Sequence, residues 1–70
     1  MIEQRLTQHG HTRRFIIEHA SPEGWVVEEE LDSEVLNRRQ YKDWHRVERA
    51  VRMQVSVLEQ HGWDLQQATV

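Results

Sequence analysis

The distribution of apolar and polar residues divides the chain into strand-like segments followed by one helical segment. Residues 13–20, 25–31 and 35–41 each contain aromatic or β-branched residues, which suit a pleated, half-buried surface. Residues 44–61 instead carry apolar side chains at spacings of three and four, which is one stripe of a helix. The pattern therefore predicts three strands and then one long helix.

A short turn joins the first two predicted strands. In Pro22-Glu23-Gly24, proline presets φ for the first turn position and glycine accepts a positive φ without a steric penalty. This composition predicts a three-residue hairpin loop, a type I turn followed by a left-handed residue and a bulge. The loop would pair Ser21 with Trp25.

The second turn, over residues 32–34, sets the register of the third predicted strand by placing Leu31 opposite Val35. The same register predicts three further cross-strand pairs, which are Val27–Arg39, Trp25–Tyr41 and Glu28–Arg38. Because side chains alternate between the faces of a strand, one face is predicted to be apolar. This inner face would contain Phe15, Ile17, Trp25, Val27, Leu31, Val35 and Tyr41.

The helix has recognisable signals at both ends. Asp43 is a suitable N-cap. Gly62 stands where a left-handed residue follows a helix, and Trp63 would then contact Leu58, as in a Schellman ending. The apolar stripe between these ends consists of Trp44, Val47, Val51, Val55 and Leu58. A helix over residues 44–61 would be about 27 Å long and would match the strands, each about 23 Å.

These elements predict an α+β domain in which one long C-terminal helix packs on one face of a three-stranded antiparallel meander. The domain would span residues 13–63 and would be followed by a tail, residues 64–70. Residues 1–12 have the weakest pattern and are compatible with a short helix, a frayed tail or an extra edge strand. With 70 residues and no cysteine, the chain has a thin core and no disulfide, and such small domains often gain stability by oligomerising.

More apolar side chains are present than one helix on one sheet needs. A second helix ridge and the outer sheet face would both carry apolar residues, which makes them interface candidates: Ala50, Met53 and Val57 on the helix, and Ile16, Val26 and Leu36 on the sheet. A two-fold homodimer is the interpretation that we favour. The alternative is that the chain termini cover these ridges through Ile2, Leu6, Leu65 and Val70.

Charge is segregated along the sequence. Residues 18–34 contain seven acidic residues and no lysine or arginine, whereas residues 38–52 contain six basic residues. An acidic central strand beside basic neighbours accounts for this pattern through ion pairs across the sheet. The alternative is a basic patch for nucleic-acid phosphates, formed by Arg38, Arg39, Lys42, Arg46, Arg49 and Arg52. The net charge of −3 and the acidic strand argue against nucleic acid.

The sequence offers little chemistry. His9 and His11 are the only residues with a metal-like spacing, and one imidazole pair without a thiolate is a weak site. Neither a nucleophile with a paired base nor a glycine-rich phosphate loop is present. Glu29 is unusual because the register places it on the inner face, where it needs a rim position, a partner such as Arg52, or a register shifted by one.

The sequence thus predicts a small non-catalytic interaction or assembly module that forms a homodimer and needs no cofactor. The alternative is a small nucleic-acid-associated regulator that uses a basic helix face. No apolar run approaches the roughly 18 residues that a membrane span requires. No signal-peptide pattern precedes the first strand, so we expect a cytoplasmic location.

Overall fold

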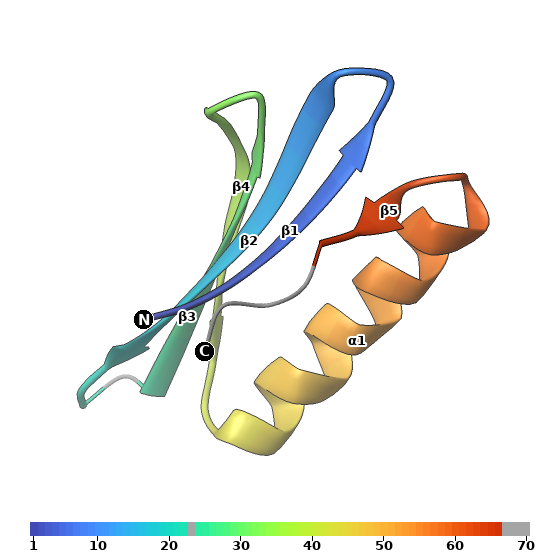
Figure 1. Cartoon of the computed structure of the whole chain (residues 1–70). Helices are drawn as coiled ribbons and strands as arrows, with labels where there is room; N and C mark the ends of the chain where they lie inside the picture. The colour runs from blue at the N-terminus through green and yellow to red at the C-terminus, as the bar shows by residue number, and fades with distance from the viewer. Residues whose placement is uncertain (23, 67–70) are drawn as a thin grey trace.

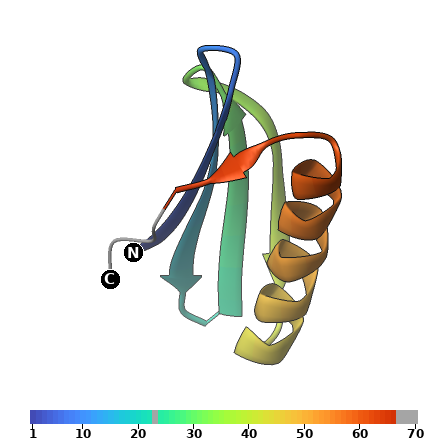
Figure 2. The same ribbon diagram turned by 45° about the vertical axis from the view of Figure 1, so that its right-hand side comes forward.

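The computed structural model describes residues 1–22 and 24–66, which form one antiparallel sheet with a helix across one face (Figure 1; Figure 2). The elements are β1 (Ile2–Gln8), β2 (His11–Ala20), β3 (Gly24–Leu31), β4 (Glu34–Tyr41), α1 (Trp44–Gln60) and β5 (Asp64–Leu65). The five strands lie in the order β4-β3-β2-β1-β5. The predicted α+β class with an antiparallel sheet and one helix is confirmed, but the prediction of three strands is wrong.

The N-terminal segment forms strand β1, so the strand alternative is the correct one for residues 2–8. β1 pairs antiparallel with β2 from Ile2 opposite Ile17 to Gln8 opposite His11. His9 and Gly10 connect the two strands with φ of 49° and 81°. Two successive residues with positive φ are typical of the tight turn whose twist matches that of its flanking strands.

The loop between β2 and β3 differs from its prediction. Trp25 pairs with His19 rather than with Ser21, and the last pair before the loop is Ala20 with Gly24. Glu23, part of the predicted turn, lies outside the described residues. Gly24 begins β3 with a φ of 99°, and a Cβ there would collide with the carbonyl oxygen of Tyr41. Because the register of β2 and β3 moves by two residues, the side chains of these two strands keep their predicted faces.

The predicted register between β3 and β4 is confirmed over most of its length, with Val27 opposite Arg39 and Trp25 opposite Tyr41. It changes between Glu29 and Glu30, where β4 contains one extra residue and Val35 pairs with Glu30. The predicted inner position of Val35 is therefore wrong, and its side chain is 57% exposed. The physical reason is a β-bulge, which shifts the pairing by one and reverses the faces beyond it.

The helix α1 follows its prediction closely, ending one residue earlier than expected. The Asp43 side chain accepts a hydrogen bond from the backbone N–H of Arg46 at 2.9 Å. At the other end, the N–H of Trp63 donates to the Leu58 carbonyl at 3.0 Å, and Gly62 has a φ of 93°. This is the predicted Schellman ending.

The core lies between the sheet and α1. Its side chains come from the first three strands and from the helix stripe: Leu6, Phe15, Ile17, Val27, Val47, Val51, Val55 and Leu58. Trp25, Tyr41 and Trp63 pack against this cluster and remain partly exposed. Leu6, for which a strand was one of three predicted alternatives, is fully buried.

The two edges of the sheet differ. After α1 the chain returns to the sheet as β5, which pairs with β1 through Leu65 opposite Leu6 and Asp64 opposite Thr7 (Figure 2). The N–H of Gln66 also donates to the carbonyl of Arg5 at 2.8 Å. Within the described residues no strand pairs with the outer side of β4. The position predicted for Val70 lies outside the described residues.

Candidate interaction site

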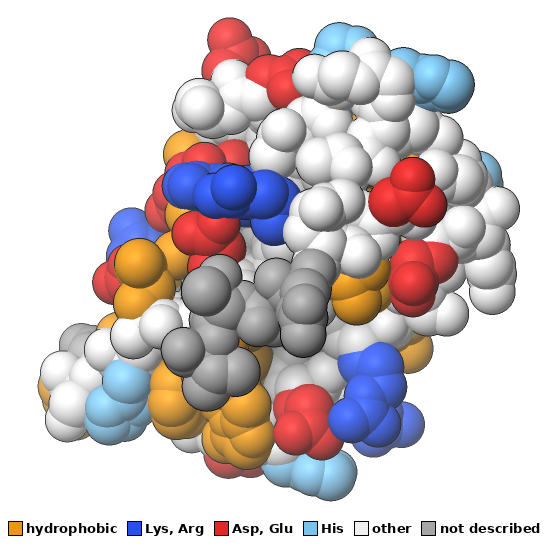
Figure 3. Space-filling view, viewed as in Figure 1, with side chains coloured by type: hydrophobic (Ala, Val, Ile, Leu, Met, Phe, Trp, Pro, Cys, Tyr) orange, Lys and Arg blue, Asp and Glu red, His pale blue; other side chains and the backbone are white. Residues whose placement is uncertain are grey.

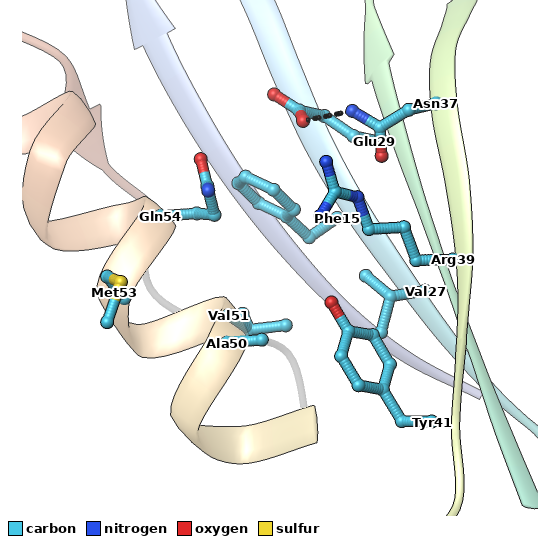
Figure 4. Close-up of a pocket in the computed structure, with 10 residues that line it drawn as sticks. All are labelled: Phe15, Val27, Glu29, Asn37, Arg39, Tyr41, Ala50, Val51, Met53 and Gln54. Atoms are coloured by element: carbon cyan, nitrogen blue, oxygen red, sulfur yellow. Dashed lines mark hydrogen bonds between the residues drawn. The ribbon is translucent and has the colours of Figure 1, made fainter. Parts of the chain in front are cut away.

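A groove of about 350 Å³ separates β4 from α1 on the helix side of the sheet (Figure 4). Its floor is apolar and comes from the core, and polar side chains of β3, β4 and α1 border it. The lining residues are Phe15, Val27, Glu29, Asn37, Arg39, Tyr41, Ala50, Val51, Met53 and Gln54. An apolar hollow with a few convergent polar groups is the usual form of a binding site.

The two-residue period of β4 explains which of its side chains reach the groove. Asn37, Arg39 and Tyr41 lie two apart and pair with inner-face residues of β3, so all three point to the helix side. Figure 4 shows Arg39 and Tyr41 extending from β4 toward the Phe15 ring, opposite α1. β4 thus forms one wall of the groove and α1 the other.

Glu29 stands at one end of the groove, where its carboxylate is fully engaged. It accepts hydrogen bonds from Arg13 Nη1 at 2.9 Å and from Asn37 Nδ2 at 2.9 Å. The Arg13 guanidinium also lies over the Trp63 ring, 5.1 Å from its centroid. Glu29 is thus buried, at 7% exposure, with a partner, but the partner is Arg13 of β2 rather than the helix residue Arg52.

Three other polar side chains of the groove lack such hydrogen bonds to described residues. Neither Arg39 nor the Tyr41 hydroxyl nor the Gln54 amide makes a side-chain hydrogen bond or ion pair with any described residue. A guanidinium beside an apolar floor can bind a carboxylate through two parallel N–H donors. The groove can therefore hold an apolar side chain next to an anionic group.

A second exposed feature is the outer side of α1. Met53 is 61% exposed and Val57 is 44% exposed, and Ala50 lies between this side and the groove. We call Ala50, Met53 and Val57 the helix ridge. Two large apolar side chains one helical turn apart at this exposure are a candidate contact surface.

The apolar row predicted for the outer sheet face does not form. Val26 is only 6% exposed, and Ile16 pairs with Glu28 rather than with Val26. Leu36 lies in the β4 bulge and is 48% exposed. Ion pairs join the acidic strand to Arg13 and Arg14, whereas the predicted Glu28–Arg38 pair shares only a register position. Figure 3 shows acidic and basic side chains adjoining over the sheet.

The basic neighbours of the acidic strand lie mainly on β2. Arg14 bonds Glu30 at 2.9 Å and approaches Glu3 at 3.6 Å on the outer face, while Arg13 bonds Glu29 on the inner face. Arg14 and Glu30 are directly opposite in the register of β2 and β3, and Arg13 and Glu29 form a diagonal pair. Both pairs favour this register.

The six basic residues proposed for nucleic acid are divided among several surfaces. Arg38 pairs with Glu28 in the register on the outer sheet face, whereas Arg39 points into the groove. On α1, Arg46 lies 3.6 Å from Asp43, and Arg52 lies 3.2 Å from Glu48. Lys42 and Arg49 form no ion pair with a described residue. The structure therefore does not gather the six into one phosphate-binding strip.

The histidine pair does not form a metal centre with other described residues, since these contain no group of three or more histidine or acidic side chains suited to a metal. His11 Nδ1 instead lies 2.7 Å from Asp32 Oδ2. A backbone hydrogen bond from Thr12 and the contact with His11 lower the pKa of the exposed Asp32 carboxyl. Asp32 thereby connects the turn between β3 and β4 to the start of β2.

No family model, curated protein or solved structure matches this chain. Within the described part of the chain, no helix is both long enough and apolar enough to cross a membrane. The site therefore has to be interpreted from its own geometry.

Sequence reasoning found the helix ridge but missed the groove. Asn37, Arg39 and Tyr41 share a face by their spacing, which was a usable signal. The groove that they border depends on where α1 lies across the sheet, which no local sequence pattern predicts.

Proposed function

We propose that this protein is a small non-catalytic interaction module that forms a homodimer through the helix ridge. The observation that carries the proposal is the exposure of Met53 and Val57, which are 61% and 44% exposed on α1. Covering such a group of apolar side chains with a second surface removes them from water, which lowers the free energy.

Charge favours one orientation of the two helices. In an antiparallel pair with Met53 at the two-fold axis, Arg49 of one copy lies beside Val57 of the other. The alkyl part of an arginine can cover an apolar neighbour while its guanidinium stays in water. A parallel pair would place Arg49 opposite Arg49, and this like-charge contact supports the antiparallel arrangement.

The dimer is expected to be weak. Stable complexes bury about 800 Å² on each partner, and the apolar part of the ridge consists of two large side chains and one alanine. The molar mass should therefore rise with concentration from the 8.5 kDa of one chain. A dissociation constant in the micromolar range or weaker is the expected result.

The test is sedimentation equilibrium at several concentrations. Val57→Asp and Met53→Asp each introduce a charge into the ridge and should give folded monomers. Val57→Leu keeps the ridge apolar and is the matched control, which should still dimerise. Unchanged far-UV circular dichroism would show that the variants fold. Dimers of unchanged strength in both aspartate variants would contradict the proposal.

The non-catalytic part of the proposal is supported by the state of the groove. Its carboxylate, Glu29, is already bound by Arg13 and Asn37, so it is poorly placed to act as a free base. The remaining polar groups, Arg39, Tyr41 and Gln54, are better suited to binding than to proton transfer at neutral pH. We propose a cytoplasmic location with no cofactor as part of the same function.

A further inference from the structure

We infer that the open edge of β4, together with the groove beside it, binds an acidic extended segment of another protein. The segment would add a strand to the sheet next to β4. This inference goes beyond the proposed homodimer and does not require it. Ala50 and Met53 of the helix ridge also line the groove, whereas Val57 lies outside it.

The first observation is the state of the edge. All residues of β4 are exposed except Tyr41, which is half-buried, and no described strand pairs with its outer side. Alternate residues of such a strand direct N–H and C=O groups away from the sheet. These groups are a template for one more strand, and main-chain hydrogen bonds supply much of the affinity in that binding mode.

The second observation is the groove, which adjoins the edge on the helix side. A strand added beside β4 would place every second side chain on the face that carries Asn37, Arg39 and Tyr41. Met53 and Gln54 of α1 form the opposite wall (Figure 4). One large apolar side chain of the segment can therefore enter the groove above Phe15.

The third observation is charge, which selects the partner. Arg38 and Arg39 lie on opposite faces of β4, Lys42 follows the strand, and none of them forms an ion pair with a described residue. Asp43, which follows Lys42, already contacts Arg46, and Glu28 lies opposite Arg38 in the register without forming an ion pair with it. A segment with acidic side chains on both faces would match these three positive charges.

The same charges disfavour a second copy of this chain as the occupant. Antiparallel pairing of two β4 strands about their centre would bring Arg38 and Arg39 of both copies together near the two-fold axis. Like charges on neighbouring strands are destabilising. The edge is thus suited to an acidic partner, and self-association is left to the helix ridge.

The experiment uses a labelled ten-residue peptide, blocked at both ends, in which pairs of glutamates alternate with pairs of valines around one central phenylalanine. Both faces of the added strand then carry glutamate. Binding is measured by fluorescence anisotropy, and the contact site is mapped by NMR amide shifts. We expect the largest shifts in β4 and binding that weakens with salt. A peptide with lysine in place of glutamate should bind at least tenfold more weakly.

A third peptide separates strand addition from simple charge attraction. Replacing the valines by proline keeps the glutamates but removes N–H donors, because proline has none. This peptide should also bind at least tenfold more weakly. Equal binding of the proline or lysine peptide, or shifts that avoid β4, would overturn the inference.

Two protein variants test the charges. Arg38→Glu combined with Arg39→Glu should weaken binding of the acidic peptide at least tenfold and should instead bind the lysine peptide. Arg49→Glu makes the same kind of change on the outer side of α1 and should alter binding less than twofold. An equal loss in Arg49→Glu, or no loss in the double variant, would contradict the assigned site.

Two further outcomes separate the proposals from one another. The monomeric Val57→Asp variant should still bind the acidic peptide, since Val57 does not line the groove. Loss of peptide binding in that variant would count against the edge site but not against the dimer. A short single-stranded oligonucleotide that displaces the peptide and binds more tightly would identify the surface as a nucleic-acid site and overturn the inference.

Discussion

The two sides of the sheet differ: β5 pairs with β1 at one side, whereas no described strand pairs with the outer side of β4 at the other. β5 covers part of β1, and Leu6 beneath it is fully buried. The outer side of β4 has no described strand beside it, and its apolar residues Val35 and Leu36 are about half exposed. One edge therefore contributes to the core, whereas the other leaves backbone groups and arginine side chains exposed.

The difference has a physical cause in how α1 crosses the sheet. The buried residues of α1 pack against Leu6 of β1. At the C-terminal end of the helix, Gln8 Nε2 donates a hydrogen bond to the His61 carbonyl at 2.8 Å. The buried side chains of α1 thus pack on side chains from β1 to β3, and the groove lies between α1 and β4. The groove beside β4 follows from the same helix position that closes the β1 edge.

The largest expected effect comes from the buried residue of the covered edge. Leu6→Ala removes a fully buried side chain and should lower the free energy of unfolding by about 2–5 kcal/mol. Leu36→Ala, at the open edge, should cost less than about 0.5 kcal/mol. Urea denaturation of both variants measures the difference. Similar losses in the two would show that the edges do not differ as described.

A smaller effect is expected at the turn that carries the chain from α1 to β5. Gly62→Ala forces a residue with a Cβ to a φ of 93° and places that Cβ 2.7 Å from Gln8 Nε2. Gly10→Ala has a similar φ of 81° but open space around its Cβ. Each should lose about 1–2 kcal/mol from backbone strain. Gly62→Ala should lose about 1 kcal/mol more, because the Gln8 hydrogen bond to His61 is disturbed.

The measurement is again the free energy of unfolding, now compared between two alanine variants. Thermal unfolding of both under one buffer condition would give the ranking. If Gly10→Ala were the more destabilised variant, the contact between Gln8 and the helix end would not contribute to closing this edge.

The smallest effect concerns the turn that begins the open edge. The pKa of Asp32 is lowered in the folded state, first by the Thr12 N–H and then by His11. A lowered carboxyl pKa stabilises the fold above the unfolded pKa, and this contribution disappears as the pH falls through the lower folded value. Asp32→Asn should thus be slightly less stable than the parent at pH 7.

The two proteins should become more alike at strongly acidic pH, because protonated aspartate also loses the contribution. Melting temperatures from pH 7 down to about 2 test this, since an ordinary aspartate titrates near 4. A difference that grew as the pH fell would mean that Asp32 does not act through its charge.

Much of this fold could be predicted from local patterns. The bounds of α1 were predicted from three short-range signals, which are the apolar stripe from Val47 to Leu58, the Asp43 cap and the Gly62 ending. The pairing of Trp25 with Tyr41 was also correct. A wrong hairpin register at Ser21 left the faces unchanged, since it was an even shift.

The remainder could not be predicted because it depends on contacts distant in sequence. Two residues, Asp64 and Leu65, form β5 only because Leu6 and Thr7 lie beside them. The bulge at Leu36 has no glycine or other local signal. The helix ridge at Met53 and Val57 was predicted from spacing, whereas the groove depends on where α1 lies across the sheet.

The central claim is that the two exposed surfaces have different roles, the helix ridge in self-association and the β4 edge in binding an acidic partner. The most direct test is a dilution series of the isotope-labelled wild-type protein, followed by amide NMR shifts without any ligand. The account predicts that Met53, Val57 and their α1 neighbours shift on dilution while β4 stays unchanged. Shifts confined to β4, or no shifts at any concentration, would contradict it.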